Sequence, residues 1–250
     1  MIDSKNKSRI VGLLILVSLF CVASVNTVGA QAQTPAQVSL QIYQVELDKL
    51  SEFRAAMKEW AALEKKAGTP FFNVSETAAL GDTGKFVVVS PVANFADFGT
   101  ASVTGPERDA LVARFTKCVV SRQVMSVTPL ADTKPLPPGQ APKLSVFQII
   151  NVAPGRAEDY VAWLRSEFFA NFPEETHYVA GRIGLGGTSG FVRAIFFDDW
   201  DDLAKGPPVR RKVGAERAAA ISAKQAGIAT GAESMVLRYL PDISYDTRTP

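Results

Sequence analysis

The sequence has little of the chemistry that most catalytic and metal sites use. It contains two cysteines and one histidine, and Cys21 lies in an apolar segment near the N-terminus. Cys118 is then the only cysteine of the remaining chain, so no disulfide within it is expected. His177, the sole histidine, cannot build a zinc site or a Cys-His nucleophile with the residues available. We therefore predict no metal ion and no cofactor.

The N-terminal 30 residues have the pattern of an export signal. Lys5, Lys7 and Arg9 precede an apolar run over 10–25, and small residues follow near Ala30. This pattern predicts a Sec-type signal peptide over 1–30 and a periplasmic or extracellular location, with no stable membrane anchor after cleavage. An uncleaved N-terminal anchor is the alternative, because the run approaches the length of a short spanning helix.

Net charge is the next thing that the chain lacks. Without residues 1–30, the 27 basic residues fall by three and the 25 acidic residues by one, which leaves 24 of each sign. Nucleic-acid partners require a basic surface, and so do anionic membranes. A balanced chain argues against both kinds of partner.

What the chain does contain is one pattern of elements, written twice. The first copy predicts strands over 38–45, 72–79, 86–90 and 123–127, with helices over 47–67 and 106–120. A Pro-rich stretch over 132–142 interrupts it. The second copy predicts strands over 144–152, 178–184, 191–197 and 235–240, with helices over 155–172, 200–205 and 209–226.

The offset between the copies is nearly constant. Phe72 and Tyr178 are 106 positions apart, and Phe86 and Phe191 are 105 apart. A constant offset across a whole unit indicates internal duplication. We predict a first repeat over 38–131, a linker over 132–142, a second repeat over 143–243 and a polar tail over 244–250.

Each repeat has the order β-α-β-β-α-β, and in each the hairpin is followed by an aromatic and acidic helical turn, NFADF at 94–98 and DWDDL at 199–203. In this the chain resembles the dimeric α+β-barrel superfamily as a fused tandem pair. The resemblance implies an α+β fold with two ferredoxin-like repeats packed sheet to sheet as one intramolecular barrel. Members of this shape include antibiotic-biosynthesis-type monooxygenases, haem-degrading enzymes and chlorite dismutase-like proteins, so it implies no single activity.

The first strand of each repeat suggests what lines the barrel. Gln41 and Tyr43 share one strand face, and Gln148 occupies the matching face of the second repeat. We predict that this face points into the barrel, where two amides and a phenol among apolar residues would suit a small organic ligand. A packed core between the repeats is the alternative.

The second hairpin places two cations close together. With its turn centred on 187–188, Arg182 lies opposite Arg193, and like charges there are destabilising. Three explanations stay open: an anionic ligand between the sheets, an ion pair from Glu76 across the pseudo-twofold, or a solvent-facing edge with a different register.

Catalytic candidates are few. Tyr43, His177 and Trp200 are the candidates, with His177 interpreted first as a loop residue and second as a general base or haem ligand. The sequence therefore predicts an exported protein that binds a small organic or anionic molecule between its repeats. The alternatives are a cofactor-free monooxygenase-like enzyme and a non-catalytic interaction scaffold, and self-association into a homo-oligomer is left open.

Overall fold

The computed structural model describes residues 37–92, 103–187 and 190–248. These residues belong to one compact unit of the chain. The predicted signal peptide and the segment 94–98 lie outside them. Among the described residues, none of the helices combines the length and the apolar character needed to cross a membrane.

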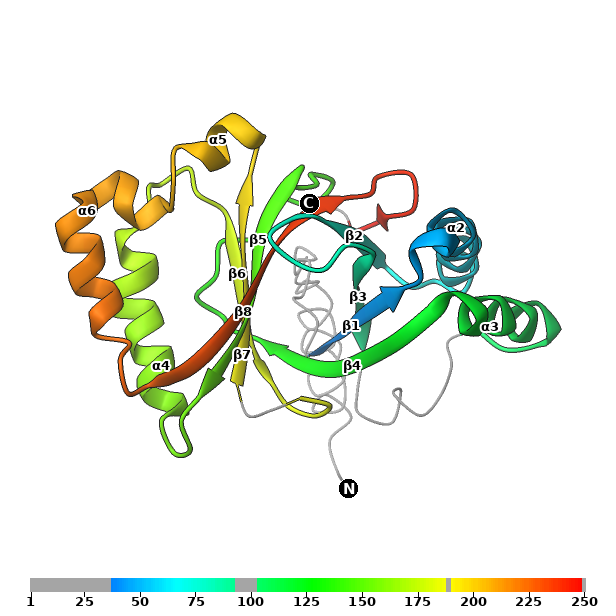
Figure 1. Ribbon diagram of the computed structural model, residues 1–250, viewed down its shortest axis with the longest axis horizontal. Coiled ribbons are helices and arrows are strands. Elements are labelled where there is room, and N and C mark those ends of the chain that lie inside the picture. Colours follow the sequence, from blue (N-terminus) through cyan, green and yellow to red (C-terminus); the bar gives the residue numbers. More distant parts are fainter. Residues whose placement is uncertain (1–36, 93–102, 188–189, 249–250) are drawn as a thin grey trace, which may run out of the picture. The chain divides into compact units, whose positions relative to one another are not determined.

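The first half has the order strand, helix, two strands, helix, strand (Figure 1). Its elements are β1 (Gln37–Val45), α2 (Leu50–Lys66) after a 3-10 turn (Leu47–Lys49), β2 (Phe71–Ala79), β3 (Lys85–Val92), α3 (Pro106–Cys118) and β4 (Val119–Pro129). The strands pair antiparallel in the order β4-β1-β3-β2. This is the ferredoxin-like arrangement.

The second half repeats that arrangement with an irregular first helix. Its elements are β5 (Leu144–Val152), α4 (Ala157–Trp163), a π-helical segment (Leu164–Phe168), a 3-10 turn (Phe169–Asn171), β6 (Tyr178–Ile183), β7 (Gly190–Phe197), α5 (Trp200–Ala204), α6 (Pro208–Ala223) and β8 (Ala229–Tyr239). The strand order is β8-β5-β7-β6. A last short strand, β9 (Tyr245–Asp246), lies in the predicted polar tail and pairs with β2.

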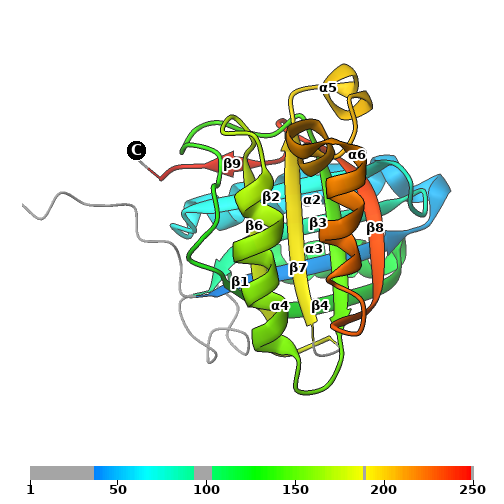
Figure 2. The ribbon, with the colours of Figure 1, turned by 90° about the vertical axis from the view of Figure 1, so that its left-hand side faces the viewer.

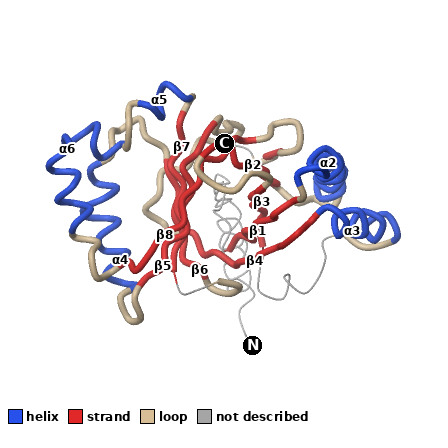
Figure 3. Tube along the Cα trace, in the orientation of Figure 1, coloured by secondary structure: helices blue, strands red, loops and turns tan. Residues whose placement is uncertain are grey.

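Two seams join the halves into a closed barrel. Strand β4 pairs with β6, and β2 pairs with β8, so that the eight long strands form one continuous antiparallel ring. The helices lie outside this ring, α2 and α3 over the first sheet and α4 and α6 over the second (Figures 2 and 3). Closure leaves none of these eight strands with a free edge.

The barrel interior is packed with apolar side chains. The buried members of this cluster are Leu40, Ile42, Val87, Met125, Val127, Phe147, Ile183, Val192, Ala194, Met235 and Leu237. The sequence prediction that placed Gln41, Tyr43 and Gln148 inside is therefore wrong. Tyr43 packs instead in the layer between the first sheet and its helices, and the face that carries Gln148 and Ile150 belongs to the corresponding second layer. Both strand faces are buried, so alternation alone does not tell which face points inward.

Each hairpin turn contacts a strand of the other half across a seam. Gly81, in the β2–β3 hairpin, lies against Met235 of β8, and Gly186, in the β6–β7 hairpin, lies against Val124 of β4. Gly186 has φ +82°, and a Cβ atom there would stand 1.8 Å from the Val124 carbonyl oxygen. Only glycine fits this approach.

A buried carboxylate ties the β2–β8 seam. Glu76 is 5% exposed and forms ion pairs with Arg54 of α2 and Arg238 of β8. Its partner across the halves is thus Arg238. The suggested pairing of Glu76 with Arg182 is wrong, because Arg182 opposes Thr128 at the other seam.

Candidate functional site

The register of the second hairpin differs from the predicted one. Arg193 lies opposite Ala180, and Arg182 lies opposite Phe191. The two arginines are therefore not directly opposed, and the predicted repulsion between them is wrong. The turn centres on 186–187, one position earlier than expected. The hairpin contains several glycines, each of which can occupy a turn position, so the sequence does not specify where the turn is centred.

Arg182 sits on a half-exposed surface. Its guanidinium pairs with Glu158 of α4 and stands 5.5 Å from the ring centroid of Phe191. The side chain is 43% exposed. A cation with an ordinary surface partner needs no ligand to balance it.

Arg193 is in the opposite situation. The residue is 9% exposed and lies between the second sheet and the helix that begins with α4. Its Nε donates a hydrogen bond of 2.6 Å to Gln148 Oε1, and its guanidinium stands 4.3 Å from the ring centroid of Phe168. Gln148 in turn donates to Ser234 Oγ at 2.7 Å. Among the described residues, Arg193 forms no ion pair.

Two neighbouring polar groups near Phe191 have buried atoms without a hydrogen-bond partner among the described residues. The atoms are Nη1 of Arg193 and the hydroxyl oxygen of Tyr160, a fully buried residue. The two groups are close enough to influence each other, although no well-formed hydrogen bond joins them. Burial lowers the pKa of Arg193, and burial raises the pKa of Tyr160. Burying Nη1 of a cation and a hydroxyl without a good hydrogen-bond partner for either is costly.

The first half carries apolar residues at the same two places. Gln41 pairs with Val88 across β1 and β3, as Gln148 pairs with Arg193 across β5 and β7. The ring of Phe53 lies 4.7 Å from that of Phe86, and the ring of Tyr160 lies 4.7 Å from that of Phe191.

Phe53 and Val88 thus correspond to Tyr160 and Arg193. The polar pair is not required by the fold, since one copy of the unit packs without it.

Gln41 has a different arginine. Its Oε1 accepts hydrogen bonds from Arg122 of β4 at 2.7 Å and from the Tyr43 hydroxyl at 2.6 Å. Arg122 is exposed, so water reaches its remaining nitrogens. Gln41 and Gln148 were both predicted to bind a ligand, and the structure places them in separate layers, one beside a solvated arginine and one beside a buried arginine.

The three catalytic candidates do not meet. Tyr43 lies in the first half, where burial raises its pKa despite Arg122 nearby. The Nδ1 of His177 lies 3.0 Å from the carbonyl oxygen of Pro135, just before β6. Trp200 is 50% exposed at the start of α5. In the described part of the chain, no contact brings these three side chains together.

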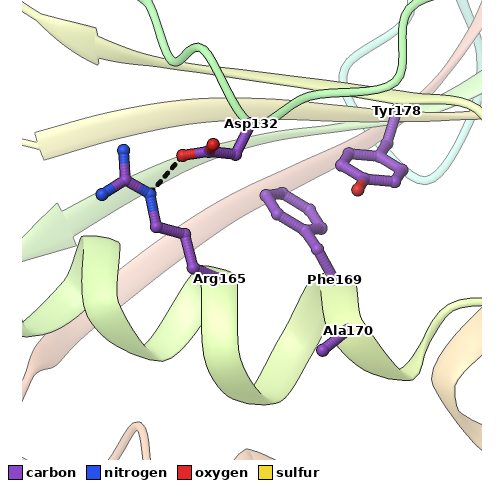
Figure 4. Close-up of a pocket in the computed structure, with 5 residues that line it drawn as sticks. All are labelled: Asp132, Arg165, Phe169, Ala170 and Tyr178. Atoms are coloured by element: carbon purple, nitrogen blue, oxygen red, sulfur yellow. Dashed lines mark ion pairs between the residues drawn. The ribbon is translucent and has the colours of Figure 1, made fainter.

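The surface pockets of the described structure include two near these residues. One, of about 210 Å³, is lined in part by Lys85 and Glu233, which form an ion pair between the halves. The other, of about 340 Å³, lies beside the helix that covers Arg193 (Figure 4). Within the described residues, there is no group of three or more side chains suited to holding a metal ion.

Tyr160 is the functional candidate that the sequence reasoning missed. It was interpreted only as part of the apolar face of a helix. A comparison of the two repeats position by position would have found it. At buried positions, Tyr160 stands where the first repeat has Phe53, and Arg193 stands where it has Val88.

Comparison with known proteins bears on the fold. No family model matches the chain, and no curated protein matches it by sequence. A solved structure from Lactobacillus acidophilus that carries a provisional monooxygenase name superposes with a TM-score of 0.60 at 11% identity, covering 86% of this chain and 97% of its own. The fold is that of a dimeric α+β barrel, with both ferredoxin-like halves in one chain.

Two further solved structures agree. An anthrone oxidase-like protein matches with a TM-score of 0.59 at 14% identity, over 87% of this chain and 96% of its own. A mutant chlorite dismutase from Candidatus Nitrospira defluvii matches with a TM-score of 0.53 at 10% identity, over 84% and 94%. At such low identity the likeness concerns the fold, and activity has to be argued from the site.

Proposed function

We propose that this protein binds a small organic anion in the layer between its second sheet and the helix that begins with α4, with the charged group of the ligand on Arg193. The observation that carries the proposal is the buried guanidinium without an ion pair. Arginine stays protonated in proteins, so its charge persists in this layer. Buried charges are as a rule paired, and an anionic ligand would supply the missing partner.

The surroundings of Arg193 fit this role. The ring of Phe168 offers a cation–π contact, which stabilises a desolvated cation by about 2 kcal/mol. A carboxylate would bind more strongly, because hydrogen bonds between charged groups are roughly twice as strong as neutral ones. Arg193 Nη1 and the Tyr160 hydroxyl are the free donors for such a group.

This proposal changes the location that the sequence suggested. The barrel interior is filled by its apolar cluster, so the ligand is assigned to the outer layer of the second half and not to the space between the repeats. Export remains part of the proposal and is supported by the pattern of residues 1–30 alone.

A monooxygenase-like activity is the second candidate. It is supported by the provisional name of one fold neighbour and the anthrone oxidase-like name of another. In a cofactor-free oxygenase, Arg193 would stabilise the deprotonated substrate. An interaction scaffold is the third reading, and no surface among the described residues indicates a partner for it.

The test compares two arginines that donate to equivalent glutamines. Arg193→Met removes the buried cation, and Arg122→Met removes the exposed one. Benzoate is the probe, and benzamide is its neutral counterpart of the same shape, with binding measured by isothermal titration calorimetry.

We expect Arg193→Met to weaken benzoate binding by at least about tenfold, because a hydrogen bond to a charged group contributes that much. Arg122→Met should bind like the unaltered protein, and benzamide should bind poorly. Equal benzoate affinity in Arg193→Met, or equal binding of benzamide, would contradict the proposal.

A further inference from the structure

The pocket of about 340 Å³ has a charged rim and an aromatic wall (Figure 4). Asp132, from the segment after β4, forms an ion pair with Arg165 of the π-helical segment. Beside that pair, the rings of Phe169 and Tyr178 stack with their centroids 4.1 Å apart and an interplanar angle of 18°. Ala170 completes the lining. Both members of the ion pair are more than half exposed, so the rim is open to solvent.

This pocket and Arg193 lie over the same strand face. Tyr178 and Ala180 both belong to the apolar layer beneath the helix, and Ala180 is the residue opposite Arg193. Residues two apart on a strand face are separated by about 7 Å. Tyr178, in the aromatic wall of the pocket, and Ala180, opposite Arg193, are therefore neighbours on this strand face.

Aromatic rings occupy the space between them. The Phe169 ring, which lines the pocket, lies 5.6 Å from the Phe168 ring, and the Phe168 ring covers the guanidinium of Arg193. These two phenylalanines are consecutive, at the junction of the π-helical segment with the 3-10 turn. A continuous row of side chains thus leads from the solvent-facing rim to the buried cation.

The backbone that carries these rings is irregular. The corresponding helix of the first half, α2, runs as 17 uninterrupted α-helical residues. In the second half, α4 gives way after seven residues to π-helical and 3-10 geometry. Isolated π segments are rare and often mark functional sites. Phe168 is the last residue of this π-helical segment.

We infer that this pocket and the layer around Arg193 form one elongated site. The inference rests on the proposed function and specifies its ligand: an organic monoanion with an apolar body longer than one aromatic ring. The anionic head takes the place of the Phe168 ring over Arg193, the body lies against Phe169 and Tyr178, and the far end reaches the rim formed by Asp132 and Arg165.

This arrangement selects against short anions. Acetate or inorganic phosphate would pair with the Arg193 guanidinium. Neither has an apolar body to replace the packing that the Phe168 ring loses when it is displaced. A longer aryl or alkyl acid restores that apolar contact, and each buried methylene contributes about 0.8 kcal/mol, or roughly fourfold in affinity. A polar group at the far end would meet the Arg165 guanidinium, whose ion pair with Asp132 uses Nε.

The test varies ligand length and pocket volume together. Benzoate is the short probe and 4-phenylbutyrate is the long one, and 4-phenylbutyramide is the neutral control. Ala170→Trp fills the pocket from its exposed lining residue. Ala162→Trp places the same ring on an exposed residue of α4 that does not line the pocket, and Arg193→Met removes the cation. Affinities are measured by calorimetry, with circular dichroism and thermal melting to confirm that each variant is folded.

We expect 4-phenylbutyrate to bind at least about tenfold tighter than benzoate. Ala170→Trp should remove this advantage and leave benzoate affinity unchanged, while Ala162→Trp should change neither. If Ala170→Trp leaves the long ligand unaffected and Arg193→Met still abolishes binding of both, the elongated site is refuted and the proposed function stands. If Arg193→Met binds both anions normally, the proposed function fails and this inference with it.

Discussion

The two halves of this barrel have the same strand register and different buried chemistry. In the first half, the layer between sheet and helices holds Phe53 against Phe86, with Val88 opposite Gln41. In the second half, Tyr160 and Arg193 occupy the places of Phe53 and Val88. The first layer shows that the fold packs with apolar residues at these two positions. The polar groups of Tyr160 and Arg193 are therefore not explained by packing, and we assign them to function.

The helices that cover the two layers also differ, and the irregular one lies over the polar layer of the second half. Helix α2 is regular over its whole length, whereas the chain after α4 passes through π-helical and 3-10 geometry directly above Arg193. Irregular geometry and an uncompensated charge occur in the same half and in the same layer. Proteins commonly accept such local costs at functional sites.

The largest expected effect concerns the two seam hairpins. Gly186→Ala should destabilise the protein by about 4 kcal/mol or more, because the new Cβ would overlap the Val124 carbonyl oxygen and φ is positive. Gly81→Ala is the matched change at the other seam. There the Cβ would meet the Met235 Cβ at 3.0 Å with an ordinary backbone, and we expect a cost of about 1 kcal/mol.

Urea denaturation measures both free energies of unfolding. Equal losses at the two hairpins would show that the seams are equivalent and that the close approach at Gly186 is relieved by movement of β4.

A smaller effect tests the buried polar pair directly. Val88→Arg introduces an unpaired cation into the apolar first layer and should lower the free energy of unfolding by about 3 kcal/mol. Arg193→Met replaces the existing cation with an apolar side chain of similar length and should raise it by about 1 kcal/mol.

Chemical denaturation of the two variants, followed by circular dichroism, provides the measurement. A large loss of stability in Arg193→Met would mean that the arginine is there to hold the second half together, which would remove its contrast with Val88.

The smallest effect concerns Tyr245, which binds the C-terminal strand to the first half. Burial raises its pKa from 10.0 to about 12. The folded state therefore favours the neutral phenol. This contribution to stability is complete below pH 10 and is lost as the pH rises from 10 to 12.

Tyr245→Phe removes the ionisable phenol. The free energy of unfolding of the unaltered protein, minus that of the variant, should therefore fall between pH 10 and pH 12. The other tyrosines ionise in both proteins and cancel in the difference. A pH-independent difference would indicate that β9 is already detached from β2 at this alkaline pH.

The sequence predicted the order of the elements well, because strands, hairpins and helices leave local patterns. The near-constant offset between Phe86 and Phe191 indicated a duplicated unit, and the structure has the predicted fold class. The interior face was predicted wrongly for a physical reason: Leu40 and Ile42 on one face, and Tyr43 and Val45 on the other, are both covered in a closed barrel. Periodicity identifies such a strand and does not orient it.

The candidate site was predicted only in part. Arg193 and Gln148 were singled out, and the structure joins them by a hydrogen bond. Their setting was missed, since the hairpin register was placed one position late and the π-helical interruption leaves no signal in an apolar helix pattern. Tyr160 was concealed by its neighbours, which make the same apolar stripe that any core helix shows.

The β2–β8 seam also has a consequence for how the chain folds. Strand β2 lies near residue 75 and pairs with β8 near residue 237, and β9 at Tyr245–Asp246 adds a second contact to β2. Contacts between such distant segments form slowly, since the long intervening chain must first be brought together. During synthesis, β2 therefore keeps one unpaired edge until β8 has been made, and a chain interrupted before β8 would expose that edge to aggregation.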